Sequence, residues 1–305
     1  MPNCEHLNIL FITCDQLRAD ALGCYGNPVI RTPHIDALAA GGTRFDRMHV
    51  ASPVCAPNRA SIATGRWPSV HGLRLNGCVL PAAELTLMEC LRQAGYATFG
   101  AGKTHFKPQW SHAPGDIEAL RRGADRGIGA VDPQPQPWEF PFYGFEQAAF
   151  TEDNRAGPYA DYLRAQGLDP WADPHSFSYP QHTTVRSAWP EEHHQTTWVA
   201  DRSLEFLARC DPERPFFLWT SFVHPHHPFN PPAPYDTMYA PADMPPPLWD
   251  PAEVELWPDA LREKYFARSG SHEAISMCEL TDDDFRRVKA YYYGMISLID
   301  KQVGR

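Results

Sequence analysis

Three continuous apolar runs restrict the fold of this chain more than any other feature. They cover residues 8–13, 96–102 and 215–223. An uninterrupted run of this length is typical of a strand buried on both faces, and such strands occur mainly in parallel sheets. Segments with helical spacing of apolar residues lie between and after the runs, at 32–40, 84–94, 197–207 and 281–305. The alternation predicts an α/β fold, a three-layer α/β/α sandwich with a mostly parallel central sheet.

Polar residues follow each run directly, where the predicted strand ends. They are Asp15 and Gln16 after the first run, Lys103 and His105 after the second, and His224, His226 and His227 after the third. Because the carboxyl ends of parallel strands meet at one edge of a sheet, we expect these side chains to converge. The oxygen donors suit a divalent cation, and the basic groups suit an anionic substrate. The alternative for Asp15 is that it only caps the following helix.

Cys55 lies in a turn-forming stretch between Pro53 and Pro57, and a first helical turn is expected over 59–64. A side chain near a helix N-terminus faces free N–H groups and the positive end of the helix macrodipole. Arg59 would add a permanent cation with a fork of donors. The stretch therefore predicts an electropositive pocket for a tetrahedral anion around one reactive side chain. The alternative is that Cys55 is a small buried apolar residue, as most isolated cysteines are.

Charge, hydropathy and cysteine usage exclude several classes of protein. The net charge of −10 repels nucleic acid and anionic membranes, and no apolar run approaches the roughly 18 residues of a membrane span. The N-terminus has no basic region before its first apolar run, so no signal peptide is expected. The eight cysteines form no CxxC pair, which favours a reducing, cytoplasmic compartment over a disulfide framework. The sequence leaves the oligomeric state open, a homo-oligomer included.

Residues 107–195 differ in character from the rest of the chain. They are rich in Pro, Trp, His and Gln and show weak periodicity. Loops of this length inside a compact protein are usually functional or flexible. We therefore expect 107–195 to be a loop-rich excursion within a catalytic domain over 1–305, forming the walls of a pocket at the carboxyl edge of the sheet.

The segment Cys55-x-Pro-x-Arg59, followed by Thr-Gly-Arg66, resembles the signature of the type I sulfatases of the alkaline phosphatase superfamily. Gly-Lys103-Thr-His105 is similar to the sulfate-binding element of that family, and Pro-His226-His-Pro is similar to its later histidine loop. Asp15-Gln16 matches its first metal-binding pair, with Gln where many members have a second Asp. Within the family, the chain resembles arylsulfatases and phosphonate monoester hydrolases.

This resemblance implies roles for individual residues. In the family, the cysteine of the motif is oxidised to formylglycine by a formylglycine-generating enzyme. By that resemblance Cys55 is the precursor of the nucleophile, Arg59 holds the modified residue, and His226 protonates the leaving group. Further roles implied by the resemblance are sulfate binding by Lys103 and His105, substrate contacts by Asn76, His224 and His227, and metal binding by Asp15, Gln16 and residue 55. Ca²⁺ is the expected metal, with Mn²⁺ and Mg²⁺ as alternatives.

The predicted function is metal-dependent hydrolysis of sulfate monoesters, small anionic substrates, by a formylglycine made from Cys55. Phosphonate monoester hydrolases share the Asp-Gln pair and an Asn at the place of Asn76, so phosphonate monoester or phosphodiester hydrolysis is the alternative. They lack the Lys103–His105 pair, which favours sulfate. Members of the family continue with a strand ending in Asp-His-Gly that completes the metal site. The chain is therefore expected to resemble only the N-terminal part of a sulfatase and to be poorly active alone, and a catalytically silent fragment is the second alternative.

Overall fold

The computed structural model describes residues 7–107, 139–155, 157–173, 183–247, 251–259, 262–263 and 280–305. The chain divides into two compact units. The first comprises Met1–Asp15, Arg44–Pro170 and Gln195–Val223, and the second comprises Gln16–Thr43, Trp171–His194 and His224–Arg305. No helix among the described residues is both long enough and apolar enough to cross a membrane.

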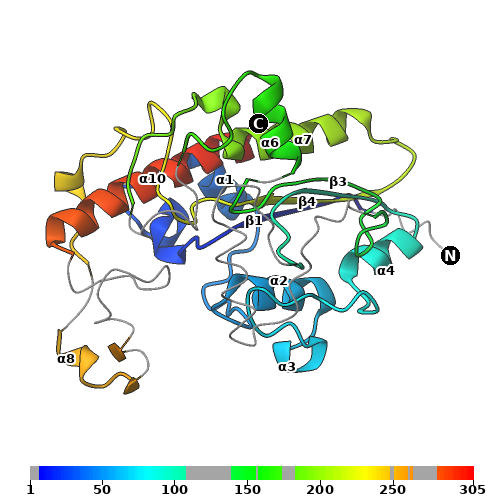
Figure 1. The fold of residues 1–305 in the computed structure, drawn as a ribbon, viewed down its shortest axis with the longest axis horizontal. Helices are drawn as coiled ribbons and strands as arrows, with labels where there is room; N and C mark the ends of the chain where they lie inside the picture. The colour runs from blue at the N-terminus through cyan, green and yellow to red at the C-terminus, as the bar shows by residue number, and fades with distance from the viewer. Residues whose placement is uncertain are drawn as a thin grey trace. The chain divides into compact units, whose positions relative to one another are not determined.

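The first unit is built on a parallel four-stranded sheet. Its strands lie in the order β1 (Ile9–Cys14), β4 (Phe216–Phe222), β2 (Ala97–Gly102) and β3 (Gln147–Phe150). Figure 1 shows α2 (Cys55–Thr64), α3 (Pro68–His71) and α4 (Leu87–Gln93) on one face of the sheet, and α6 (Pro158–Ala165) and α7 (Gln195–Arg209) on the other. The predicted three-layer α/β/α sandwich is confirmed, and so are the three apolar runs as its strands.

The packing of α2 on the sheet determines where Cys55 lies. Ala56, Ala60 and Ala63 are fully buried at helical spacing and belong to the same core cluster as Phe217 and Trp219 of β4. Alanine side chains at the contact let a helix approach a sheet closely. On the opposite face, Phe206 of α7 stacks on Phe99 of β2 with ring centroids 4.7 Å apart. Both faces of the sheet are therefore covered, as the continuous apolar runs require.

Several boundaries differ from the sequence-based expectation. Helix α2 begins at Cys55 itself and not near residue 59, because Pro57 falls within the first turn, where its missing N–H costs nothing. Helix α4 begins at Leu87, since the hydroxyl of Thr86 accepts a hydrogen bond from the N–H of Glu89 and caps it.

The segment 107–195 also differs from the expected loop excursion where it is described. Residues 147–150 form the edge strand β3, and 158–165 form helix α6. Both were missed because β3 is only four residues long and α6 has two turns, too short to show a period. Residues 108–138, 156 and 174–182 lie outside the described part of the chain, and the proposed role of this segment as a pocket wall stays a prediction.

The second unit is organised by α10 (Asp282–Gly304) packed with α1 (Pro33–Gly41). The predicted N-cap at Thr281 is confirmed, and it forms a reciprocal capping box with Asp284. Asp300 accepts hydrogen bonds from the first N–H groups of α1, including that of Ile35 at 2.8 Å. Short elements complete the unit: η1 (Ala19–Ala21), η2 (Gly23–Tyr25), η3 (Glu191–His193), η4 (Pro241–Asp243) and α8 (Pro251–Val254).

Gly102, the last residue of β2, yields a testable prediction about the sheet. Its φ is +89°, and a Cβ there would overlap the carbonyl oxygen of Ser221 on β4. Gly102→Ala should therefore cost about 3 kcal/mol or more in the free energy of unfolding. The matched control is Gly95→Ala, at φ +95° with nothing near its Cβ position. That change should cost only about 1 kcal/mol of backbone strain. Urea unfolding measures both, and equal losses would contradict the assigned close approach of the strands.

Candidate active site

The carboxyl edge of the first unit's sheet holds a buried cluster of charged side chains. Lys103, which follows β2, is completely buried, and its Nζ lies 2.6 Å from Oδ2 of Asp15. The same Nζ donates to both carboxylate oxygens of Asp153, each at 2.6 Å. Asp15 follows β1, and Asp153 lies three residues after β3. Three parallel strands therefore deliver one ammonium and two carboxylates to a single point, as parallel topology allows.

Arg59 connects helix α2 to this cluster. Its Nη1 donates to the carbonyl oxygen of Lys103 at 2.7 Å and to Oγ of Ser221 at 2.8 Å, and its Nη2 lies 3.4 Å from Oδ2 of Asp15. The side chain is buried. A guanidinium with three such partners is held in one orientation, so Arg59 fixes the start of α2 relative to strands β1, β2 and β4.

Cys55 is the first residue of α2, and Asn76 is its nearest polar partner. The Cys55 thiol donates to Oδ1 of Asn76 at 3.4 Å, and the N–H of Ala56 donates to the same oxygen at 3.1 Å. Asn76 thus caps the helix N-terminus from a neighbouring loop, and it orients the side chain of residue 55 at the same time. Sequence reasoning selected Cys55 and Asn76 separately, and the structure brings them together.

The environment of Cys55 differs from the expected electropositive pocket. Burial raises the pKa of the thiol, Lys103 acts in the opposite direction, and Asp153 and Asp15 raise it further. The two carboxylates offset the cations, so the thiol stays protonated near neutral pH. The expected suitability of this pocket for a tetrahedral anion stays a prediction.

Glu152, a residue that the sequence analysis missed, shapes the chain after β2. Its Oε1 accepts hydrogen bonds from the backbone N–H groups of Thr104 at 3.0 Å and His105 at 2.9 Å. His105 adopts φ +55°, a conformation that a non-glycine residue needs such support to hold. Gln195 at the start of α7 donates to the carbonyl oxygen of Glu152 at 3.0 Å. Burial raises the pKa of Glu152 to about 7.

Glu152 and Asp153 had a signal in the sequence. Thr151–Asn154 is a polar run directly after the short apolar run Ala148–Phe150, the arrangement already noted after the three longer strands. The run was overlooked because it lies inside the Pro-rich segment and is only three residues long. Among the described strands, β3 lies at the edge of the sheet and pairs only with β2.

His105 does not supply the positive charge expected of it. It is 5% exposed, and burial, with the charge of Lys103, lowers the pKa of its imidazole to about 3. The ring is therefore neutral near pH 7, and Lys103 and Arg59 are the cations of the cluster.

The remaining predicted site residues belong to the second unit. There, Nδ1 of His227 donates to Oε1 of Gln16 at 3.2 Å, and Nδ1 of His226 donates to the carbonyl oxygen of His227 at 2.6 Å. The ring of His224 lies 4.7 Å from that of His194. The second unit therefore places Gln16 against the predicted histidine loop, while the roles assigned to these four residues stay predictions.

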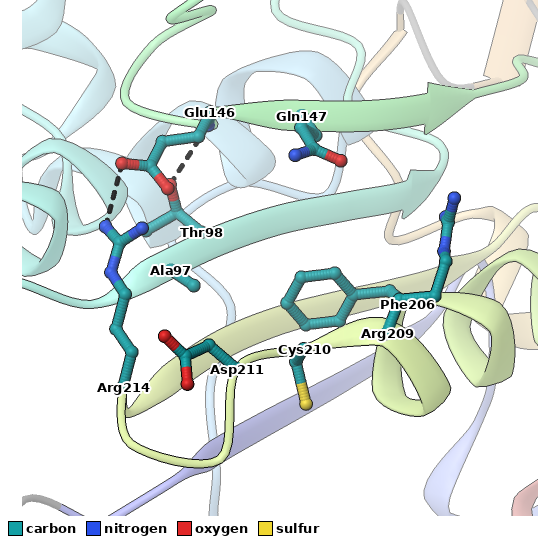
Figure 2. A pocket seen from close by; sticks show the side chains of 9 residues that line it. All are labelled: Ala97, Thr98, Glu146, Gln147, Phe206, Arg209, Cys210, Asp211 and Arg214. Atoms are coloured by element: carbon teal, nitrogen blue, oxygen red, sulfur yellow. Dashed lines mark hydrogen bonds and ion pairs between the residues drawn. The ribbon is translucent and has the colours of Figure 1, made fainter.

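A hollow of about 360 Å³ lies at the opposite, amino edge of the sheet (Figure 2). Its polar side chains hold the strands together: Arg214 pairs with Glu146 at 2.8 Å and also donates to the carbonyl oxygen of Tyr96. Thr98 Oγ1 accepts the N–H of Glu146. Because these groups are already paired with one another, the hollow is a structural junction of β2 and β3 and not the candidate site.

Comparisons with known proteins show the family of the chain. The profile of the sulfatase family matches residues 7–305. An arylsulfatase of Clostridium perfringens is 32% identical over 98% of this chain and 58% of its own length. The multifunctional alkaline phosphatase superfamily protein PehA of Trinickia caryophylli is 31% identical over the same shares. The crystal structure of a phosphonate monoester hydrolase of Agrobacterium radiobacter superimposes with a TM-score of 0.74, at 27% identity, over 98% of this chain and 58% of that one.

The α/β fold is similar to that of proteins of the alkaline phosphatase superfamily. The chain belongs to the sulfatase family. The chain spans 58% of the length of the arylsulfatase and of PehA.

The neutral state of buried His105 predicts how stability depends on pH. Its folded-state pKa of about 3 lies below the unfolded value of about 6.5, so stability is complete above pH 6.5 and falls as the pH drops below it. Between pH 7.5 and 5.5 the wild type should lose about 1 kcal/mol more than His105→Gln in urea unfolding. Glu152 acts in the opposite direction, so only this comparison isolates His105.

The control for this measurement is His49→Gln, since His49 is an exposed histidine of the same unit. It should keep the wild-type dependence on pH. If His105→Gln and His49→Gln behave alike, the imidazole of His105 is not held neutral by the fold.

Proposed function

We propose that this chain carries the nucleophile and anion-binding groups of a metal-dependent sulfate monoester hydrolase, with formylglycine made from Cys55. The observation that supports this most is the position of Cys55 at the first residue of α2, held by Asn76 and facing the Lys103 cluster. A protonated thiol is a poor nucleophile. The same side-chain position is suited to a residue that does not depend on thiolate chemistry.

Each residue of the first unit then has a defined task. Formylglycine, as the hydrated aldehyde, supplies a hydroxyl nucleophile and a route to release sulfate by elimination. Asn76 holds the side chain of residue 55, and Arg59 fixes the helix that carries it. Lys103 offers positive charge to a transferred group whose negative charge shifts during the reaction. His105, neutral and buried, is suited to hydrogen bonding with the ester and not to charge neutralisation.

A divalent cation fits the donor set of the cluster. Asp15 supplies a buried carboxylate, and hard oxygen ligands are those that Ca²⁺, Mg²⁺ and Mn²⁺ prefer. The proposed ligands are Asp15, Gln16, which follows it in the chain, and residue 55, with Ca²⁺ as the first candidate. When bound, the cation would act as a Lewis acid toward the transferred group.

The predicted tasks in the second unit follow from the sequence. His226 is proposed to protonate the leaving alcohol or phenol, and His224 and His227 to contact the substrate. The modifying partner is a formylglycine-generating enzyme, and the cytoplasm is the proposed compartment.

Phosphonate monoester or phosphodiester hydrolysis is the second candidate function. It is favoured by the similarity to the Agrobacterium radiobacter phosphonate monoester hydrolase. The Lys103–His105 pair favours sulfate esters instead. A catalytically silent chain is the alternative of a different class, and the assays below distinguish all three.

The assignment of Cys55 predicts a specific modification. When the chain is produced together with an active formylglycine-generating enzyme, peptide mass spectrometry should find the thiol of Cys55 replaced by an aldehyde. Cys78, another half-buried free cysteine of the same unit, is the internal control and should stay a thiol. An unmodified Cys55, beside a known sulfatase that the same enzyme does modify, would falsify the nucleophile assignment.

The preference between ester classes is tested at Lys103 and His105. In a completed protein that also carries the metal-completing Asp-His segment of the family, modified at Cys55 and loaded with Ca²⁺, Lys103→Ala and His105→Ala should each lower kcat/KM for an aryl sulfate by about 10²-fold, the usual effect of losing one charge-stabilising donor. The losses for a phosphonate monoester should be smaller. Lys107→Ala, an exposed lysine four residues on, is the control and should change neither rate.

Thermal melting of each variant shows whether the fold survives. Equal losses for the two esters, or faster phosphonate turnover by the wild type, would favour the second candidate. No turnover of either ester by the modified wild type would favour the silent chain.

A further inference from the structure

The cluster at the carboxyl edge is balanced in charge. Among the described residues, and before the divalent cation proposed above is counted, it contains two carboxylates, Asp15 and Asp153, and two cations, Lys103 and Arg59, and all four side chains are more than nine-tenths buried. A bound cation adds the same charge in every variant, so it does not alter the difference that Asp153 makes. Buried charges are screened far less than surface charges, so each one acts strongly on any anion that enters the site. The number of negative charges that the site accepts therefore depends on this balance.

Asp153 is the residue that completes the balance. Both of its carboxylate oxygens lie 2.6 Å from Nζ of Lys103, so its charge is directed at that ammonium. None of the roles predicted from the sequence uses Asp153. Asp153 follows strand β3, beside Glu152, which binds the backbone N–H groups of Thr104 and His105.

We infer that Asp153 is a specificity-determining residue, which neutralises Lys103 and so restricts the site to esters whose transferred group carries one negative charge. Sulfate monoesters, phosphonate monoesters and phosphodiesters belong to that class. Phosphate monoesters carry two charges above their second pKa of about 6 and are disfavoured. This inference rests on the proposed function, since it concerns the same anion site.

The physical reason is the difference between one charge and two. Removing the carboxylate of Asp153 frees about one unit of positive charge in a low-dielectric site. That gain acts once on a monoanion and twice on a dianion of the same shape. Affinity for both should rise, and affinity for the dianion should rise more. A purely structural Asp153 would change both affinities by the same factor.

Phenyl sulfate and phenyl phosphate form the matched pair of probes, because at pH 8 they have nearly the same shape and differ by one charge. Their dissociation constants are measured by calorimetry on protein made without a formylglycine-generating enzyme, so that Cys55 stays a thiol and turnover does not interfere, with Ca²⁺ present. The wild-type cluster should bind phenyl sulfate at least about tenfold more tightly. Asp153→Asn keeps the shape of the side chain and an acceptor for Lys103. It should change the ratio of the two dissociation constants by about tenfold in favour of phenyl phosphate, a change of about 1.4 kcal/mol.

Two further variants sharpen the test. Asp161→Asn removes the same charge from the surface of α6, where Asp161 pairs with Arg164, and should leave the preference unchanged. The double variant Lys103→Gln with Asp153→Asn restores the balance of charge. It should bind both probes more weakly but return the ratio toward the wild-type value. This second variant keeps the inference testable if Asp153→Asn alone fails to fold.

The outcomes separate this inference from the proposed function. If the wild type binds neither probe, the proposed anion site is wrong and the inference falls with it. If both probes bind and Asp153→Asn leaves their ratio unchanged, the inference is overturned and the proposed function stands. If Asp153→Asn instead loses Ca²⁺ binding, measured by calorimetry without probe, Asp153 is a metal ligand and the charge-balance role is overturned.

Discussion

The buried ammonium of Lys103 is the interaction on which the rest of the site depends. An isolated ammonium in the interior would be too costly to keep charged. Burial alone lowers the pKa of Lys103, but Asp15 and Asp153 outweigh that effect and raise it. Because the two carboxylates come from the ends of β1 and β3, the charge pair also ties the carboxyl ends of these strands to β2. Breaking such a buried pair from one side typically costs about 3–5 kcal/mol.

Helix α2 depends on the same cluster. Its alanine face lets it approach the sheet, and Arg59 then reaches past the helix to the backbone of Lys103 and the hydroxyl of Ser221. Two sets of contacts therefore determine the position of Cys55 at the start of α2. One is the packing of the alanine face on the sheet, and the other is the set of hydrogen bonds made by Arg59. Asn76 completes the arrangement by capping the helix and contacting the thiol. A side chain held in this way is preorganised for chemistry, whatever species residue 55 carries.

The cluster also explains why an unmodified thiol is a poor choice at this position. The two carboxylates that keep Lys103 charged also act on Cys55, and together with burial they raise its pKa. The same groups suit an oxygen nucleophile beside a divalent cation, since carboxylates are ligands for such a cation. The charge balance that suppresses thiolate chemistry is therefore compatible with the sulfatase family to which the chain belongs.

The sequence by itself determined three of the four strands of the described sheet, the motif around Cys55 and the carboxyl-edge position of Asp15 and Lys103. These follow from local patterns: apolar runs of strand length, and polar residues directly after them. Tertiary structure alone decided the partners. Asp153 and Glu152 reach the site because they follow β3, a four-residue strand that is too short to be recognised from its sequence. Asp153 also lies 50 residues from Lys103 in the chain, so no local pattern links the two. Protonation states were equally beyond the sequence, because the neutral His105 and the protonated Cys55 result from burial and from charges that only the fold brings near them.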